Sequence, residues 1–456
     1  MSISAELAAF SATTHTRELP PAVLARTRHL LLDLAGSIVR GREIESSPAL
    51  LSALRALGLG RGEHRVWGDP QTYSAPGAAL AAGVFAHSLD FDDTHAPSTS
   101  HPGAPVIAAA LAAAQMVGAS GATLLAGIVA GYEVHCRLGV ALPAGAHYER
   151  GFHPTATCGA FGAAAAAARV FGLDASAIAS AFGIVLSQSA GSLQFLANGA
   201  WTKRFQVGWA ALAGLVAATL ARDGYKGASD ALEGKHGFLN AYAPAPQPQR
   251  AVQNLGSEFE LMATGVKPYP SCRYGHAGID AALALRAEHD LQPAEIESVV
   301  YGVSHAGLLL VGAPADKKSN PQNVVDAQFS APFVLATALV TGRMQWDSYA
   351  QLQDPTIRAL LPKIRCEHSA AMEAEFPANM SGTLIIQARG ATFSQTVIVP
   401  SGEPQKFLTE AQLLAKFDGL AGPVLGGERA NALAQALLNI DRAESLSQVF
   451  GLATPA

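Results

Sequence analysis

Long apolar segments separated by short polar breaks make up most of this chain. Up to about Met262, nearly every apolar segment has the length and spacing of a helix. Breaks such as Gly172-Leu-Asp174 carry residues that end helices. Alanine and glycine fill these segments, so we expect closely packed helices and no sheet in this part of the chain. The predicted helices are Pro21–Val39, Pro48–Leu57, Ala79–Ala86, Val106–Val117, Ala122–Leu138, Thr155–Phe171, Ala175–Leu186 and Val207–Ala221.

The pattern changes after Val266. Residues 295–304 have the composition of a strand, and residues 383–399 are typical of two strands that turn at Arg389-Gly390. Helices are predicted at Gly278–His289, Ala327–Thr341, Thr409–Phe417 and Glu428–Leu438. The expected fold class is mainly α, with an all-helical domain at 1–265, a smaller α+β lid domain at 266–400, and C-terminal helices at 401–456 that return to the helical domain. A cleft between the two domains is the expected ligand site.

Composition narrows the choice of partners. The 456 residues exceed what one core usually organises, and 49% hydrophobic against 15% charged residues indicates a large interior. The net charge of −5 comes without a basic run, so neither nucleic acid nor a membrane surface is an expected partner. Residues 102–132 carry no charge and are long enough to cross a bilayer. The break at 118–121 favours two buried helices instead.

Cysteine spacing and missing motifs exclude several protein classes. The four cysteines show no CxxC spacing, which argues against a zinc ribbon, an iron–sulfur cluster or a disulfide framework. Reduced thiols and the absence of a recognisable signal peptide favour a cytoplasmic location. The sequence contains no GxGxxG after a strand, no Walker loop, no HExxH and no GxSxG.

A polar cluster follows the helix at 79–86. Three carboxylates and three imidazoles lie within residues 87–101, on a helix end and the loop after it, where chemistry is common. The carboxylates and imidazoles of this cluster are therefore candidates for chemistry. The alternative is a solvated turn whose aspartates cap helices. A divalent metal is a further alternative, but the spacing matches no metal loop known to us, so we predict no metal; its ligands would be His87, Asp90, Asp92, Asp93, His95 and His101.

Two further polar segments interrupt the apolar helices. His153 precedes Pro154, a good first helical residue, and a helix N-terminus lowers the pKa of a histidine and keeps its ring neutral. It can equally be a structural cap, and Tyr148 either shares its pocket or merely packs. Lys203 and Arg204, in the segment 198–204, precede another helix. With the free N–H groups of that helix they suggest an anion-binding site. This electropositive setting is expected to lower the pKa of Lys203. The alternative is a solvated Lys-Arg pair.

The last polar segment, residues 267–276, lies at the expected domain junction. Arg273 is the best bidentate carboxylate ligand on offer there. Cys272 in the same segment is more safely interpreted as an inert thiol than as a nucleophile.

Taken together and in order, these segments resemble the MmgE/PrpD family over nearly the whole chain. The motifs are HSLDFDDTHAPSTSHP at 87–102, ERGFHPTATCGAFGAAAAAARVFGL at 149–173, TKRFQVGWAALAGLVAATLARDGYKG at 202–227 and VKPYPSCRYGHAGID at 266–280. The resemblance implies a helical domain built from both chain ends, a lid between them, a homodimer, and chemistry on small di- or tricarboxylates without metal or cofactor. It places pocket residues at Asp90, Thr94, His101, His153 and Lys203, with Arg273 and His276 less securely assigned.

One departure from the family pattern bears on the reaction. Dehydratase and decarboxylase members place a tyrosine where this chain has Phe333, which cannot donate a proton. The resemblance therefore favours an epimerase that removes and returns a proton beside a carboxylate, with iminodisuccinate as the expected substrate. Its expected acid/base groups are Lys203, His101, His153 and Tyr148. Arg273 and the anion-binding site near Lys203 and Arg204 are expected to hold the carboxylates. The alternatives are a 2-methylcitrate-type dehydratase, a non-catalytic scaffold and a metal-dependent lyase.

Overall fold

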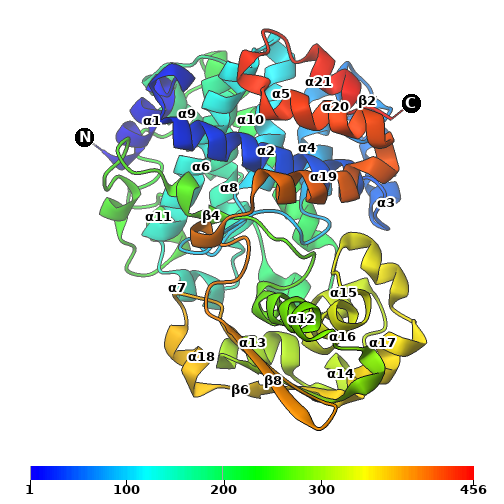
Figure 1. Ribbon diagram of the computed structural model, residues 1–456. Helices are drawn as coiled ribbons and strands as arrows, with labels where there is room; N and C mark the ends of the chain where they lie inside the picture. Colours follow the sequence, from blue (N-terminus) through cyan, green and yellow to red (C-terminus); the bar gives the residue numbers. More distant parts are fainter. Residues whose placement is uncertain (1, 198, 456) are drawn as a thin grey trace. The chain divides into compact units, whose positions relative to one another are not determined.

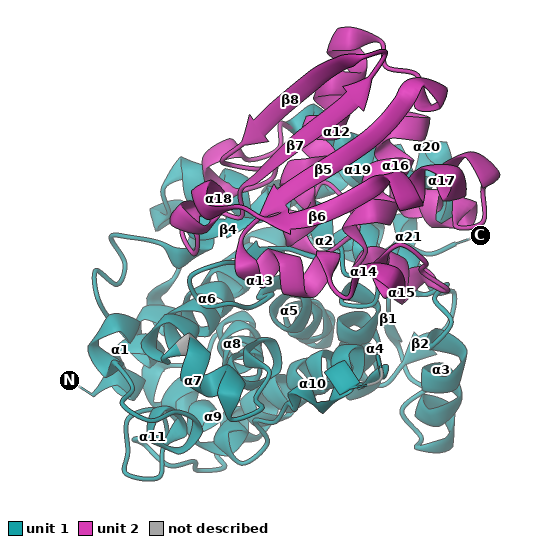
Figure 2. Cartoon of the chain, turned by 90° about the horizontal axis from the view of Figure 1, so that it is seen from below, with its two compact units in different colours: residues 1–265, 410–456 teal, residues 266–409 magenta. Residues whose placement is uncertain are grey.

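The computed structural model describes residues 2–197 and 199–455 and divides the chain into two compact units (Figure 2). Unit 1 comprises residues 1–265 and 410–456, and unit 2 comprises 266–409. The sequence-based boundary at 400 falls nine residues before the end of unit 2 at Thr409. Hydrogen bonds explain this difference: Ser401 N donates to Asp280 Oδ2 at 2.7 Å, and Val266 N donates to the Gly402 carbonyl at 2.9 Å.

Unit 1 is built mainly from helices (Figure 1). With 61% helix and 9% strand in the whole chain, the predicted mainly α fold class is confirmed. The helices of unit 1 are α1 (Ile3–Thr13), α2 (Pro21–Gly41), α3 (Ser47–Ala56), α4 (Ala75–Ala86), α5 (Gly103–Val117), α6 (Gly121–Ala141), α7 (Ala144–Glu149), α8 (Pro154–Val170), α9 (Ala175–Leu186), α10 (Thr202–Arg222), α11 (Phe238–Tyr242), α19 (Glu410–Leu425), α20 (Gly427–Leu438) and α21 (Ser447–Leu452).

Helix α8 lies at the centre of unit 1. All of its residues are buried, and it packs against α5, α6 and α10. Small residues make this packing possible: a Cβ added to Gly131 of α6 would lie 2.8 Å from the carbonyl oxygen of Gly162 in α8. The alanine and glycine enrichment seen in the sequence therefore corresponds to close helix–helix contacts.

The expectation of no sheet in residues 1–265 is wrong. Strand β1 (His64–Arg65) pairs with β2 (Thr72–Tyr73), and β3 (Thr94–His95) pairs with β4 (Thr264–Gly265), both antiparallel. Strands of two residues are too short to produce a period-two pattern in the sequence. The β3–β4 pair fixes the middle of the polar segment 87–101.

The uncharged stretch at 102–132 forms two helices, as predicted. Helix α5 ends at Gly118, which adopts the left-handed conformation, and α6 begins after Ser120, whose side chain accepts from Thr123 N. By length and composition, α6 and α10 are each apolar enough to cross a membrane, and their apolar windows are 100% and 61% buried within the described chain. Burial of this extent is typical of core helices.

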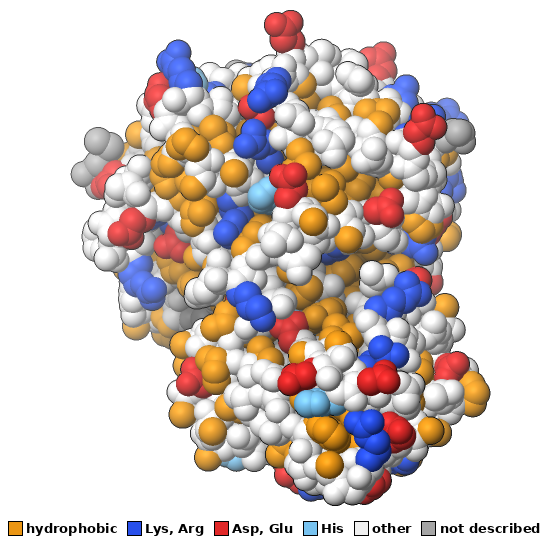
Figure 3. All heavy atoms as spheres, in the orientation of Figure 1, with side chains coloured by type: hydrophobic (Ala, Val, Ile, Leu, Met, Phe, Trp, Pro, Cys, Tyr) orange, Lys and Arg blue, Asp and Glu red, His pale blue; other side chains and the backbone are white. Residues whose placement is uncertain are grey.

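On the face drawn in Figure 3, acidic and basic side chains are interspersed.

Unit 2 contains a four-stranded sheet in the order β6-β5-β7-β8. Strand β5 (Ile296–Val303) is parallel to β6 (Ile364–His368) and antiparallel to β7 (Gly382–Ala388), which is antiparallel to β8 (Ala391–Val397). The predicted hairpin is confirmed: Arg389 and Gly390 both have positive φ, as a two-residue hairpin turn requires. Strand β6 escaped prediction because only Ile364 among its residues is fully buried.

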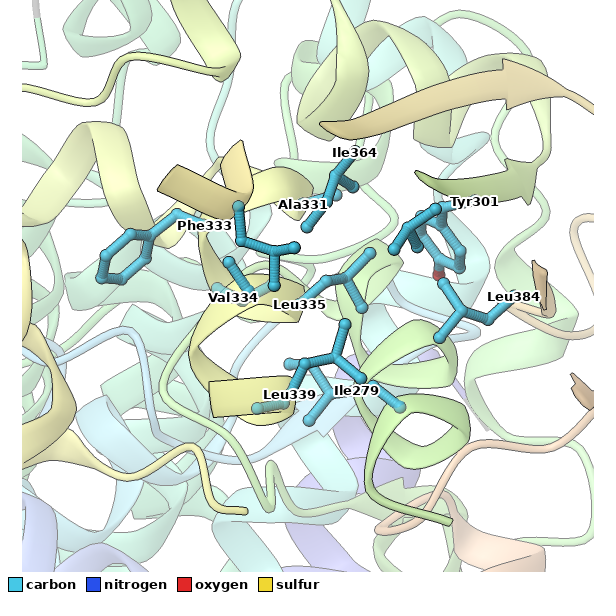
Figure 4. Close-up of a cluster of buried hydrophobic side chains, with 14 of the residues drawn as sticks. Ile279, Tyr301, Ala331, Phe333, Val334, Leu335, Leu339, Ile364 and Leu384 are labelled. Atoms are coloured by element: carbon cyan, nitrogen blue, oxygen red, sulfur yellow. The ribbon is translucent and has the colours of Figure 1, made fainter. Parts of the chain in front are cut away.

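Helices α12 (His276–His289) and α16 (Ala331–Thr341) cover the sheet core of unit 2. Figure 4 shows Ile279 of α12 and Leu335 of α16 grouped with Tyr301 and Leu384 of the strands. The single helix predicted at Ala327–Thr341 is two, because Ser330 caps the N-terminus of α16. The remaining short helices are α13 (His305–Gly307), α14 (Ala315–Lys318), α15 (Val324–Gln328), α17 (Pro355–Leu360) and α18 (Ala370–Glu375).

Candidate active site

The polar segment begins where the apolar helix α4 ends. His87 is the C-cap of α4, and the chain then runs through a loop into β3. Since α4 is buried along almost its whole length, it delivers polar side chains into the interior of unit 1 rather than to solvent. Asp90 has a φ of 54°, in the left-handed region that aspartate tolerates better than most residues.

Asp90 forms an ion pair with Lys203. The Lys203 Nζ donates to Asp90 Oδ1 at 2.7 Å, and the two side chains are 26% and 12% exposed. Helix α10 begins at Thr202, five residues before the predicted start, so Lys203 lies in its first turn. A cation is unfavourable there unless an anion accompanies it, and Asp90 is that anion.

The pKa of Lys203 contradicts the sequence-based expectation. Burial alone would lower it, but the charge and hydrogen bond of Asp90, with a further contribution from Asp92, raise the pKa above its usual value. The predicted lowering is therefore wrong, because the nearest charge is a carboxylate rather than a cation. Lys203 stays an ammonium group at neutral pH and can hold a carboxylate, but it cannot act as a base.

His153 occupies the N-cap position of α8, yet its ring is engaged elsewhere. Its Nδ1 accepts a hydrogen bond from Gln206 Nε2 at 2.9 Å, while Gln206 Oε1 accepts from Ser192 N at 2.9 Å, which fixes the orientation of the amide. Because an amide nitrogen only donates, the proton of His153 must sit on Nε2.

The pKa of His153 is lowered well below its usual value. Burial is the main cause, followed by the electrostatic influence of His87, Lys203 and His101. The direction agrees with the sequence-based expectation, although burial and neighbouring charges rather than the helix dipole produce it. His153 is thus a neutral ring with an Nε2–H that can donate a hydrogen bond.

His101 has the opposite proton arrangement. Its Nδ1 donates to the Asp93 carbonyl at 2.7 Å, so in the neutral ring Nε2 carries the lone pair. Asp92 Oδ1 lies 3.8 Å from the same Nδ1 and would stabilise an imidazolium. His101 can therefore accept a proton at Nε2.

Asp93 anchors this arrangement rather than facing a ligand. Its carboxyl accepts from Tyr132 Oη at 2.6 Å and from Gly103 N at 3.0 Å. Burial, helped by the like charge of Asp92, raises the pKa of Asp93 to about 8 despite these two bonds. Within residues 2–197 and 199–455, no group of three or more His, Cys, Asp or Glu side chains is arranged to hold a metal ion.

Tyr148 and Thr94 complete the predicted residues of unit 1. Tyr148, in α7, donates to the Thr99 carbonyl at 3.4 Å, and burial raises its pKa although the charge of Lys203 acts in the opposite direction. It is a phenol at neutral pH and can only give a proton. Thr94 is buried in β3, opposite Gly265.

The other predicted residues make hydrogen bonds of their own. Arg204 donates to Glu45 at 3.2 Å and to Ser46 at 2.8 Å, so its guanidinium serves the start of α3. In unit 2, Arg273 donates to Glu403, and His276 Nε2 donates to the Ser271 carbonyl at 3.1 Å. Of the predicted anion-binding segment, Asn198 lies outside the described residues.

Sequence reasoning missed the role of three residues. His87 and Asp92 were weighed only as metal ligands, yet they form a buried pair with His87 Nδ1 and Asp92 Oδ2 2.7 Å apart. The His87 ring centroid lies 5.1 Å from that of His101 and 5.9 Å from that of His153. Gln206 was overlooked because α10 was predicted to begin after it; three positions beyond Lys203, it lies on the same face of the helix.

Comparisons with known proteins match nearly the whole chain to one family. Residues 5–251 match the MmgE/PrpD N-terminal domain, and residues 269–442 match the MmgE/PrpD C-terminal domain. A cis-aconitate decarboxylase-like protein of Aspergillus oryzae is 27% identical, covering 99% of this chain and 97% of that protein. The cis-aconitate decarboxylase of Aspergillus terreus is 26% identical over 99% and 95%, and that of Homo sapiens is 27% identical over 93% and 89%.

Proposed function

This chain belongs to the MmgE/PrpD family, and from that premise we propose that it is a lyase acting on a small di- or tricarboxylate, with proton transfer at a carbon next to a carboxylate. The relatives that match it over almost their whole length are enzymes named as decarboxylases. The observation that carries the proposal is the gathering of Lys203, His101 and His153 around the segment 87–101, each with a fixed and different proton arrangement.

The chemistry follows from these protonation states. A carbon acid beside a carboxylate is weak, so the site must supply a base and must stabilise enediolate-like charge. The ammonium of Lys203 and the Nε2–H of His153 are two donors suited to that charge. His101 Nε2 is a proton acceptor, and Tyr148 is a neutral proton donor.

Epimerisation is the second candidate. The comparisons do not support the expected iminodisuccinate epimerase, since the matched relatives carry decarboxylase names. The observation that still favours epimerisation is Phe333, which offers no hydroxyl and is buried in the core of unit 2, where its ring stacks on Tyr349 at 5.9 Å.

A substrate panel tests the proposal. Wild-type protein is incubated with cis-aconitate, 2-methylcitrate and iminodisuccinate in deuterated water, while CO₂ release, ultraviolet absorption of an alkene and deuterium at the α-carbon are recorded. Decarboxylation or alkene formation supports a lyase, whereas deuterium exchange with inversion alone supports an epimerase. If no panel member reacts, the proposed function is wrong.

A pair of lysine variants links the activity to the site. Lys203→Met should lower kcat/KM by about 100-fold or more, because the charge that stabilises the enediolate is lost. Lys226→Met removes an exposed lysine just beyond α10 and should leave kcat/KM unchanged. Equal activity in the two variants would show that the site around Lys203 does not carry the reaction.

A further inference from the structure

His87 and Asp92 form a fully buried imidazole–carboxylate pair. Both side chains are 0% exposed, and His87 Nδ1 lies 2.7 Å from Asp92 Oδ2. Beside an ionised carboxylate, Nδ1 carries the proton, so the lone pair of the neutral ring is on Nε2. Among the residues that the structure describes, nothing forms a hydrogen bond with this Nε2.

A buried nitrogen without a partner is unfavourable and calls for an explanation. The position of His87 supplies one. Its ring meets the ring of His101 edge to face, with the centroids 5.1 Å apart, and lies 5.9 Å from His153. Its neighbours belong to the candidate site, namely Asp92, His101 and His153. A bound substrate is therefore the natural partner of Nε2.

His95 shows what a structural histidine looks like on the same segment. It is equally buried and also pairs with a carboxylate, because its Nε2 donates to Glu260 Oε2 at 3.1 Å. Its Nδ1 accepts from Ser98 N at 3.3 Å, so both nitrogens are used within the protein. His87 differs from His95 in having one nitrogen left for a ligand.

We propose that His87 is a catalytic residue that exchanges a proton with the substrate through Nε2, and that Asp92 is the positioning residue that fixes its tautomer. This inference rests on the proposed function. An imidazolium formed on His87 lies 2.7 Å from a carboxylate oxygen of Asp92, whereas one formed on His101 donates to a carbonyl and has Asp92 only at 3.8 Å. His87 is accordingly better placed than His101 to hold the positive charge during the reaction.

The proton balance closes for either lyase reaction, but His87 starts as a neutral ring in a dehydration and as an imidazolium in a decarboxylation. In a dehydration, His87 Nε2 takes the proton from carbon, the C–H electron pair forms the enediolate, and its collapse expels hydroxide, which takes that proton and leaves as water. In a decarboxylation, the C–C bond breaks, CO₂ leaves without the electron pair, and the imidazolium gives its proton to the carbon that retains the pair. The ring then regains a proton from solvent.

The first test compares two histidine variants on the substrate that the panel identifies. His87→Gln should lower kcat by about 100-fold or more with little change in KM, which is the usual contribution of an acid/base group. His95→Gln is the matched control, from the same segment with the same burial, and should reduce thermal stability but leave kcat intact. Retained kcat in His87→Gln, or an equal loss in both variants, would overturn the inference.

The second test needs no turnover. In ¹⁵N-labelled wild-type protein at about pH 8, His87 should have a proton on Nδ1, either alone or in a doubly protonated ring. In Asp92→Asn, an amide N–H replaces the carboxylate and donates to Nδ1 of His87. The ring proton should therefore move to Nε2, which is the opposite tautomer. A neutral wild-type ring protonated on Nε2 overturns the inference, even if no substrate has been found and the proposed function has failed.

Discussion

At the scale of single residues, two imidazoles of the candidate site, His153 and His101, differ in the nitrogen that carries the proton. His153 keeps its proton on Nε2 because Gln206 donates to its Nδ1, whereas His101 keeps its proton on Nδ1 because a carbonyl accepts from it. These partners are an amide and a carbonyl, whose protonation does not change with pH. The fold, and not the pH of the solution, therefore determines that His153 donates at Nε2 and that His101 accepts at Nε2.

Gln206→Glu should reverse the proton arrangement of His153. A carboxylate at this position accepts from Nδ1 and favours the imidazolium, so the pKa of His153 should rise from its lowered value and the proton should move to Nδ1. Proton-coupled ¹⁵N spectra recorded over a pH series check this directly, and kcat should fall as the neutral donor is lost. Gln435→Glu, an exposed substitution on α20, is the control. An unchanged tautomer in Gln206→Glu would contradict the assignment.

At the scale of elements, the site depends on how closely α10 approaches α4. A Cβ added to Gly83 of α4 would lie 2.8 Å from the Cα of Gly208 in α10, so the two helix backbones nearly touch. Helix α4 ends at His87, and α10 carries Lys203 and Gln206. The glycine contact thus sets the spacing between the polar segment and its partners.

Gly208→Ala should separate these two helices. Its Cβ would lie 2.5 Å from the Leu80 carbonyl oxygen, and such overpacking costs about 1–3 kcal/mol of unfolding free energy. Activity should fall further than stability alone explains, because Lys203 moves away from Asp90. Urea unfolding and kcat/KM measure the two effects. Gly419→Ala, in α19 with nothing near its Cβ, should instead be neutral or stabilise by up to about 1 kcal/mol; matching losses in both variants would contradict this account.

Helix α19, from the C-terminal end, also supports the site. Lys416 donates to Asp33 Oδ1 of α2 at 2.6 Å and to the Phe91 carbonyl at 2.8 Å, and its Nζ lies 3.9 Å from the centre of the Phe91 ring. Phe91 stands between Asp90 and Asp92 in the chain. A single buried ammonium group therefore joins both ends of the sequence to the polar segment.

Lys416→Met should destabilise unit 1 by about 3–5 kcal/mol, since it leaves the fully buried Asp33 carboxylate without its cation. Combining it with Asp33→Leu should restore most of that free energy, because no uncompensated charge remains. Urea unfolding of the wild type, the two single variants and the double variant measures the coupling. Strictly additive losses would show that the pair is not coupled as described.

At the scale of the whole molecule, buried titratable groups make stability depend on pH. Burial lowers the pKa of His135 to about 3, from a usual value of 6.5. The unfolded chain therefore binds a proton that the folded chain excludes between these values, and stability falls as the pH drops below 6.5. Asp93, whose pKa is raised to about 8, acts in the opposite direction, so the two contributions must be separated.

His135→Gln isolates the histidine contribution. The wild type should lose about 1.4 kcal/mol relative to the variant for each pH unit below the usual histidine pKa. Above that pH the difference in unfolding free energy should be constant. Urea unfolding of both proteins across the range measures it, and Asp93 cancels in the difference. If the unfolding free energies of the two proteins changed in parallel at all pH values, folding would not lower the pKa of His135.

The assembly expected from the family resemblance, a homodimer, stays a prediction that sedimentation can test. The change of composition that the sequence shows near residue 266 coincides with the start of unit 2. The end of unit 2 was less accessible, because residues 400–402 carry no hydrophobic pattern and are held by hydrogen bonds with the Asp280 carboxylate and the Val266 N–H.

The sequence by itself determined which segments become helices and hairpin strands, because burial of one apolar face imposes a period on the chain. Helix α9 was predicted to the residue, and the turn at Arg389-Gly390 follows from local backbone preference. The sequence also placed Asp90, His101, His153 and Lys203 among the candidates, since polar residues between apolar helices have few structural reasons to be there.

Only the tertiary structure decided what these residues do. Lys203 meets Asp90 across 113 positions, and this contact reverses the expected change in its pKa. Gln206 fixes the tautomer of His153 across 53 positions, and Asp92 pairs with His87. Hydrophobic periodicity reports which face of a helix is buried, whereas the partner of a polar atom depends on how separate helices pack. For that reason the protonation states on which the proposed chemistry depends could not be derived from the sequence.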